Sequence, residues 1–127
     1  MGSMKINITT ALVVLSVFTL AQAFGDNAEK GEMLFKKKGC IACHSLGTEV
    51  TNKAGPSLAN VTKTRELSWL KRWIKNPNSM HNDPEIKKLR ATHPIPMPDS
   101  HLSDQEVNDI IAYLKTASEK SLKKNDK

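Results

Sequence analysis

Apolar residues recur at helical spacing over residues 65–75. Leu67, Leu70 and Ile74 stand at offsets of three, four and seven residues. This is the period of an α-helix with one apolar side. The run ends at Asn76-Pro77-Asn78, where proline cannot continue a helix. We therefore predict a helix over residues 65–75.

A second helical period lies near the C-terminus. Its apolar face consists of Val107, Ile110, Ile111 and Leu114, with Tyr113 beside it. Ser103 and Glu106 precede this face at the spacing of a capping box, in which each side chain accepts a hydrogen bond from the other residue's backbone N–H. We predict a helix from Asp104 to about Glu119, followed by a charged, frayed tail over residues 120–127.

The segment before the cysteines is predicted to form a shorter helix. Asp26 and Glu29 stand at the spacing of an N-terminal cap and an acidic first turn, and Gly39 is expected to end the helix. Its apolar side is Met33, Leu34 and Phe35. Gly31 falls inside the helix, where glycine costs about 1 kcal/mol relative to alanine. Close approach by another helix would explain this glycine.

Proline shapes the region between these helices and the last one. Residues 83–90 begin with Asp83-Pro84-Glu85 and are expected to form one or two helical turns. Pro94, Pro96 and Pro98 alternate along the chain, which forbids a regular helix. We predict an extended, semi-rigid segment over residues 91–99.

The N-terminus has the pattern of a secretory signal peptide. Lys5 is the one charge in residues 1–23, an apolar run follows it, and Ala21-Gln22-Ala23 has small-x-small form. Cleavage is expected before Phe24. Residues 1–3 precede a second methionine and are interpreted as vector-derived. The alternative is that the apolar stretch is retained and anchors the protein in a membrane.

The charge of the chain is basic. Lys and Arg number 19 against 13 Asp and Glu, a formal charge of +6. Loss of Lys5 with the leader would leave 18 against 13, or +5. Nucleic-acid binding is disfavoured for an exported chain without interleaved aromatic residues. Long-range attraction to an acidic redox partner fits the charge better.

Both cysteines lie in Cys40-Ile41-Ala42-Cys43-His44. This is the spacing of covalent c-type haem attachment, where two thiols form thioethers with the vinyl groups and the adjacent imidazole lies under the iron. We predict one haem c with its iron, held by Cys40 and Cys43, with His44 as proximal ligand. A thioredoxin-like redox pair expects a βαβ context, and a zinc site needs further ligands.

A proline and a methionine are the predicted partners of this motif. Pro56 follows His44 by 12 residues in a Gly-Pro turn, and its carbonyl could accept a hydrogen bond from the imidazole Nδ1. Met97 is the predicted distal ligand, because the stiff proline-rich backbone loses little freedom on binding. Met80 is the rival thioether. Less favoured nitrogen ligands are His81, His93 and His101.

Two tryptophans lie on the predicted helix over residues 65–75. A buried indole N–H needs an acceptor, and a haem propionate is a good one. One of Trp69 and Trp73 is therefore expected to contact a propionate. Ordinary packing in the core is the alternative for either residue.

With these pieces in order, the chain resembles the class I cytochromes c, specifically the small monohaem bacterial type. The resemblance rests on Gly31 with Phe35, the Cys40-Ile41-Ala42-Cys43-His44 motif, Gly55-Pro56, Met97-Pro98, and the closing run from Leu102 to Leu114. It implies an all-α fold of three to five helices around one covalently bound haem, within residues 24–119. In that fold the terminal helices cross, and Gly31 admits the C-terminal helix. It also implies axial ligation by His44 and Met97 and an exposed haem edge.

The expected function is one-electron transfer in an exported bacterial electron-transport chain. A haem with both axial positions filled leaves no site for a substrate, so no enzyme activity is expected. We expect a periplasmic monomer that meets acidic redox partners or respiratory complexes. Two alternatives stay open: a gas- or peroxide-binding haem protein with a labile distal ligand, and a haem subunit of a membrane redox complex.

Overall fold

The computed structural model describes residues 26–47 and 53–125. Its elements are α2 (Ala28–Lys37), α3 (Cys40–Cys43), α4 (Val61–Thr64), α5 (Leu67–Lys75), the 3-10 helix η1 (Pro77–Met80), α6 (Pro84–Thr92) and α7 (Asp104–Asn125). The described residues form helices and connecting segments without strands, so the predicted all-α fold is confirmed. No helix within these ranges has the length and apolar character needed to cross a membrane.

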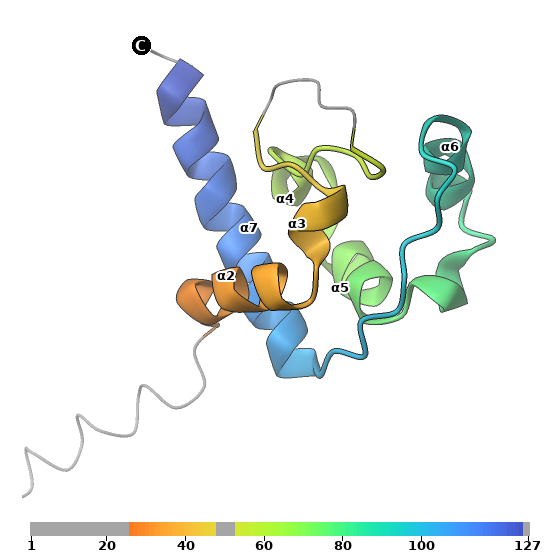
Figure 1. The fold of residues 1–127 in the computed structure, drawn as a ribbon, viewed down its shortest axis with the longest axis horizontal. Coiled ribbons are helices and arrows are strands. Elements are labelled where there is room, and N and C mark those ends of the chain that lie inside the picture. The colour runs from red at the N-terminus through yellow and green to blue at the C-terminus, as the bar shows by residue number, and fades with distance from the viewer. Residues whose placement is uncertain (1–25, 48–52, 126–127) are drawn as a thin grey trace, which may run out of the picture.

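The most extensive contact between helices joins α2 and α7, and α2 lies across α7 in Figure 1. Gly31 is the contact point, since a Cβ there would lie 1.9 Å from the backbone oxygen of Asp109 and 2.8 Å from Cβ of Tyr113. The rings of Phe35 and Tyr113 pack beside it with centroids 5.6 Å apart. The explanation of Gly31 by helix approach is therefore confirmed.

The cap of α2 is Asn27 and not the predicted Asp26. The Asn27 side chain accepts a hydrogen bond from the Lys30 N–H at 3.0 Å. Its own backbone N–H donates to Oδ1 of buried Asp109 at 2.8 Å. Asn and Asp cap helices about equally well, so helix propensity does not distinguish Asn27 from Asp26. The hydrogen bond between Asn27 and Asp109 on α7 fixes the cap at Asn27.

Two other helix ends differ from the prediction. α5 begins at Leu67, because Arg65 is extended and turns its guanidinium over the Trp69 ring and onto Glu85. α7 continues past Glu119 to Asn125, so the tail is helical over most of its length. The Ser118 hydroxyl, fully buried, donates to the Leu114 carbonyl at 2.9 Å within this helix.

The start of α7 and the position of α6 agree with the sequence prediction. The capping box at the start of α7 is confirmed: Ser103 N–H donates to Oε2 of Glu106 at 2.7 Å, and Glu106 N–H donates to Oγ of Ser103 at 3.2 Å. α6 extends the turns predicted after Asp83, and the chain from His93 to Ser103 is non-helical. α4 and η1 were not predicted. The predicted signal peptide, residues 48–52 and the last two residues lie outside the described ranges.

The apolar core lies where α5 and α7 meet α2. Its buried members are Phe35, Leu70, Ile74, Leu102, Val107, Ile110, Ile111 and Leu114. Burying a side chain of this size stabilises a fold by about 1.5–3 kcal/mol. These helices thus form a scaffold that supports α3 on one side and the 93–103 segment on the other (Figure 1).

Candidate functional site

The two cysteines are placed by a sharp turn between α2 and α3. Gly39 has φ of 76°, in the left-handed region that glycine adopts without strain. The chain then starts α3 at Cys40, and Cys43 lies about one helical turn further. Both side chains are partly buried. Burial raises the pKa of the Cys40 thiol, which disfavours the reactive thiolate of a dithiol redox enzyme.

His44 is held by the backbone of the Gly55-Pro56 turn. Its Nδ1 lies 2.8 Å from the carbonyl oxygen of Pro56. Because a carbonyl oxygen only accepts, Nδ1 carries the hydrogen and Nε2 has a free lone pair. Burial lowers the pKa of His44 below its ordinary value, although the hydrogen bond to Pro56 opposes this shift. The imidazole is therefore neutral and oriented, as a metal ligand must be.

Gly55 brings this turn against the imidazole. A Cβ at position 55 would lie 2.6 Å from Cε1 and 2.8 Å from Nδ1 of His44. The Gly55 N–H also donates to the carbonyl of Cys43 at 2.9 Å. The turn thus contacts both the motif backbone and its imidazole ring, and it needs a residue without a side chain.

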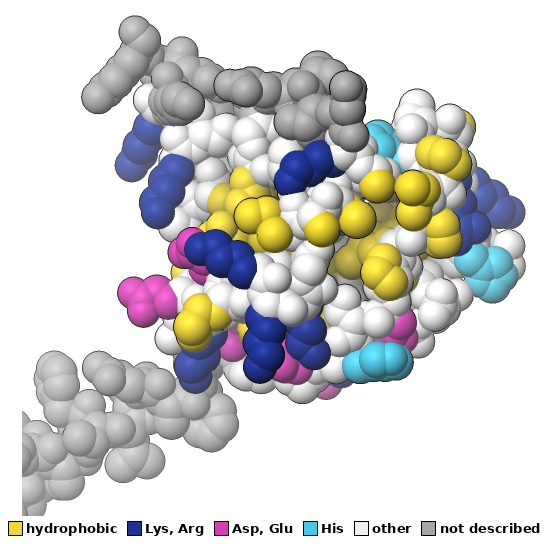
Figure 2. Space-filling view, in the orientation of Figure 1, with side chains coloured by type: hydrophobic (Ala, Val, Ile, Leu, Met, Phe, Trp, Pro, Cys, Tyr) yellow, Lys and Arg dark blue, Asp and Glu magenta, His cyan; other side chains and the backbone are white. Residues whose placement is uncertain are grey.

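A cavity of about 490 Å³ opens beside His44, within the range of about 300–1,000 Å³ usual for cofactor sites. The predicted site residues that line it are Cys40, Cys43, His44, Pro56, Trp69, Trp73 and Met97. In Figure 2 the visible face is hollowed and bordered by hydrophobic side chains. The structure therefore brings all seven predicted site residues together at one cavity.

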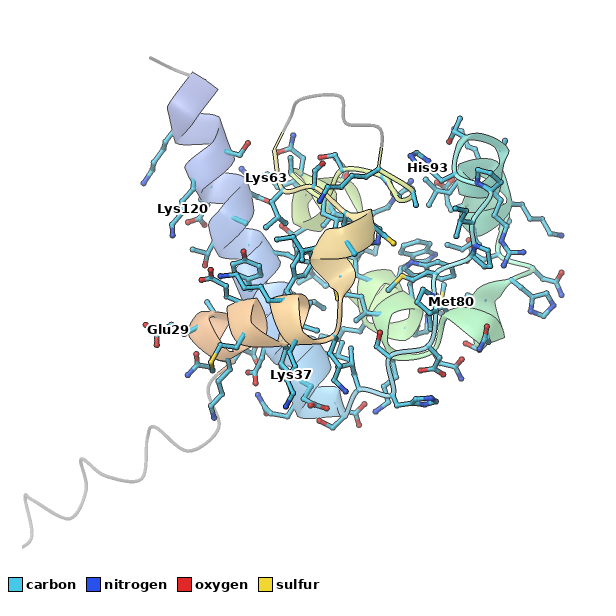
Figure 3. All side chains as sticks on the ribbon, viewed as in Figure 1. Glu29, Lys37, Lys63, Met80, His93 and Lys120 are labelled. Carbon is cyan, nitrogen blue, oxygen red and sulfur yellow. The ribbon has the colours of Figure 1, made fainter. Side chains whose placement is uncertain are left out.

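The alternative axial ligands differ in whether they line the cavity. Met80 lies on η1 (Figure 3), and its side chain is buried. It is not among the residues that line the cavity. His81 and His101 are exposed and also fall outside the lining. His93, at the end of α6, is the one rival among these that lines the cavity.

Trp69 and Trp73 stack on each other, and the Trp69 indole has a hydrogen-bond partner within the protein. The rings stack with centroids 6.1 Å apart and an interplanar angle of 20°. The Trp69 indole N–H donates to Oδ2 of Asp83 at 3.0 Å, so this donor already has an acceptor. Partial desolvation raises the pKa of Asp83, but this bond and two backbone N–H donors hold it below its ordinary value. Of the two residues, Trp73 therefore stays the predicted propionate contact.

Sequence reasoning missed several polar residues of the cavity wall. Lys38, Arg65 and Arg90 line it and supply positive charge. Asn60 also lines it, and its Oδ1 is buried without a hydrogen-bond partner in the described part of the chain. A haem fits these observations: its ring matches the apolar wall, and its carboxylates match the cations. The chain has 19 Lys and Arg, and no local pattern marks these three for the cavity wall.

The fold and the cavity define a small all-α protein with two thiols, an imidazole and a thioether facing one cofactor-sized space. The family model "Cytochrome c" matches residues 28–118. The chain belongs to the cytochrome c family, with covalently bound haem c. It is a haem-based electron carrier of the class I type, as the resemblance implied.

Individual relatives agree with this assignment. Cytochrome c-551 of Pseudomonas aeruginosa is 32% identical over 108 residues, covering 81% of this chain and 90% of that protein. The cytochrome c of Rhodothermus marinus has a similar structure, with TM-score 0.66 and 34% identity over 73% of this chain and 78% of that one. Cytochrome c oxidase subunit 2 of Bacillus subtilis is 30% identical over 105 residues, which is 73% of this chain but 27% of that protein.

Proposed function

We propose that this protein is a one-electron carrier whose haem iron has His44 and Met97 as axial ligands. When bound, haem c supplies an iron that alternates between the ferrous and ferric states. The observation that carries the proposal is that Cys40, Cys43, His44 and Met97 line the same cavity. With both axial positions filled, the iron has no open site for a substrate, which argues against enzyme activity.

Each side chain has a defined task in this proposal. Cys40 and Cys43, one helical turn apart, hold the macrocycle by two thioethers. His44 binds the iron through Nε2 while Pro56 fixes its orientation. Met97 projects from a segment with prolines on both sides, so little backbone freedom is lost when the thioether binds. Trp73 donates to a propionate.

The surface supports transfer to acidic partners. Lysines and arginines flank the hollowed face in Figure 2. Ile41 and Ile95, both exposed large apolar residues, provide an apolar contact area, and Ile95 also lines the cavity. Brief redox complexes are small, and long-range charge raises their rate of formation. We propose acidic redox proteins or respiratory complexes as partners, met by a monomer in the periplasm.

The optical spectrum of the ferric and ferrous protein tests the proposal. Ligation by Met97 predicts a weak thioether-to-iron absorption band in the ferric state, and slow binding of carbon monoxide in the ferrous state. A ferric spectrum without that band would contradict Met97 as ligand. Rapid binding of carbon monoxide would favour a gas-binding protein over a carrier.

A further inference from the structure

The cavity holds one more potential iron ligand than a haem has free axial positions. The macrocycle occupies four positions of the iron and leaves two. Three side chains that bind haem iron line this cavity: His44, Met97 and His93. His44 and Met97 fill both axial positions in the proposed function, so His93 has no assigned task.

The local setting of His93 suits metal binding. The residue closes α6, and its backbone N–H donates to the Leu89 carbonyl at 2.8 Å. Its Nδ1 lies 3.0 Å from Oγ1 of Thr92. This contact engages Nδ1 and leaves Nε2 as the available ligand atom. The ring is partly buried at the end of α6, where Figure 3 labels it.

His93 and His44 line the same cavity from different parts of the fold. His44 follows α3, whereas His93 follows α6. The segment that carries both His93 and Met97 joins α6 to α7 and lies on the far side of α5 from α3 in Figure 1. His93 therefore lines the cavity from the same segment as Met97.

Position along the chain does not explain this placement. His101 is as far from Met97 as His93 is, four residues in each case. The His101 side chain is nonetheless 88% exposed and turned toward Asp99, at 3.6 Å. The fold admits one of these two histidines to the cavity and leaves the other in solvent.

We propose that His93 is a reserve distal ligand, which binds the iron through Nε2 whenever the Met97 thioether is absent from it. The inference rests on the proposed ligation by His44 and Met97. An imidazole stabilises ferric iron better than a thioether does, so the exchange lowers the reduction potential. It also keeps the sixth position closed to small ligands.

Three haem-loaded variants test this inference: Met97→Ala, Met97→Ala with His93→Ala, and Met97→Ala with His101→Ala. We expect ferric Met97→Ala to be low-spin with two imidazole ligands by electron paramagnetic resonance. Adding His93→Ala should make it high-spin and speed carbon monoxide binding to the ferrous form at least tenfold. Adding His101→Ala should change neither measurement. Met97→Leu, which conserves volume, replaces Met97→Ala if the alanine variant unfolds.

The wild-type ferric spectrum separates the two proposals. A thioether band in the wild type together with a high-spin Met97→Ala protein would refute the reserve role alone. The same holds if His101→Ala, and not His93→Ala, opens the sixth position. A wild type without the band would refute Met97 ligation and the reserve role together.

Discussion

Replacing Gly55 by alanine tests whether the backbone of this turn holds His44 in place. The new Cβ would lie 2.6 Å from Cε1 of His44, where ordinary contact begins at 3.4 Å. The imidazole must therefore move by about 0.8 Å. Gly55 has no left-handed φ, so alanine suits its backbone and the effect is steric. We expect the movement to break or lengthen the 2.8 Å bond to Pro56.

The size and sign of the effect follow from this geometry. Overpacking of this kind lowers the free energy of unfolding by about 1–3 kcal/mol. The bond from Nδ1 to the Pro56 carbonyl makes the imidazole of His44 a stronger electron donor to the iron. Its loss destabilises the ferric state relative to the ferrous state, so the reduction potential should rise. Urea unfolding and a spectroelectrochemical titration measure the two effects.

Gly31→Ala is the matched control, since it adds the same methyl group at the crossing of α2 and α7. Its Cβ would lie 1.9 Å from the Asp109 backbone oxygen, so the helices must separate. We expect a loss of about 3 kcal/mol from overpacking, offset by about 1 kcal/mol of helix propensity. The reduction potential should not change. A Gly55→Ala protein with unchanged potential, or a Gly31→Ala protein with the same shift, would refute the reasoning.

Three further changes have expected outcomes. Cys40→Ser with Cys43→Ser should release the haem in a denaturing gel, and haem staining that persists would contradict thioether attachment. Gly39→Ala should lower the free energy of unfolding by about 1–2 kcal/mol, because φ of 76° strains alanine, and urea unfolding without a loss would contradict this. Hydrogen bonds from Ser103 hold the pKa of Glu106 below its ordinary value. The ionised Glu106 carboxylate therefore stabilises the fold above the pKa that Glu106 has in the unfolded chain. This stabilisation is lost as the pH falls through the pKa of Glu106 in the folded protein. Glu106→Gln should remove that part of the acid-unfolding curve, and an unchanged curve would exclude it.

Elements with strong local signals were predictable from sequence. The apolar period and capping box of α7 placed its first residue, and the proline after α5 placed the last residue of that helix. The start of α2 was not predictable to the residue. Its cap depends on a hydrogen bond from Asn27 to Asp109, 82 positions away. Side-chain contacts between distant elements decide such details, and no local pattern reports them.

Some residues of the candidate site could likewise be predicted from local sequence, and some of its contacts could not. Cys40, Cys43 and His44 are consecutive or nearly so, so spacing alone predicts that they share one wall. The proline-rich setting favours Met97 over Met80, and the structure adds that Met97 lines the cavity whereas Met80 does not. The bond from Trp69 to Asp83 likewise joins two elements with no common pattern. Residues with a distinctive local setting, such as Pro56 and Met97, were foreseeable, whereas contacts between residues without one needed the structure.

The crossing of α2 and α7 also has a consequence for the order of events during biosynthesis. Asn27 and Asp109 enclose nearly the whole domain between them. Closing a loop of that length costs about 2 kcal/mol more entropy than closing one of ten residues. The apolar side of α2 stays unpacked until α7 docks against it. We therefore expect a chain in which α7 has not yet docked to keep Cys40 and Cys43 accessible, so that the haem can be attached before the fold closes around it.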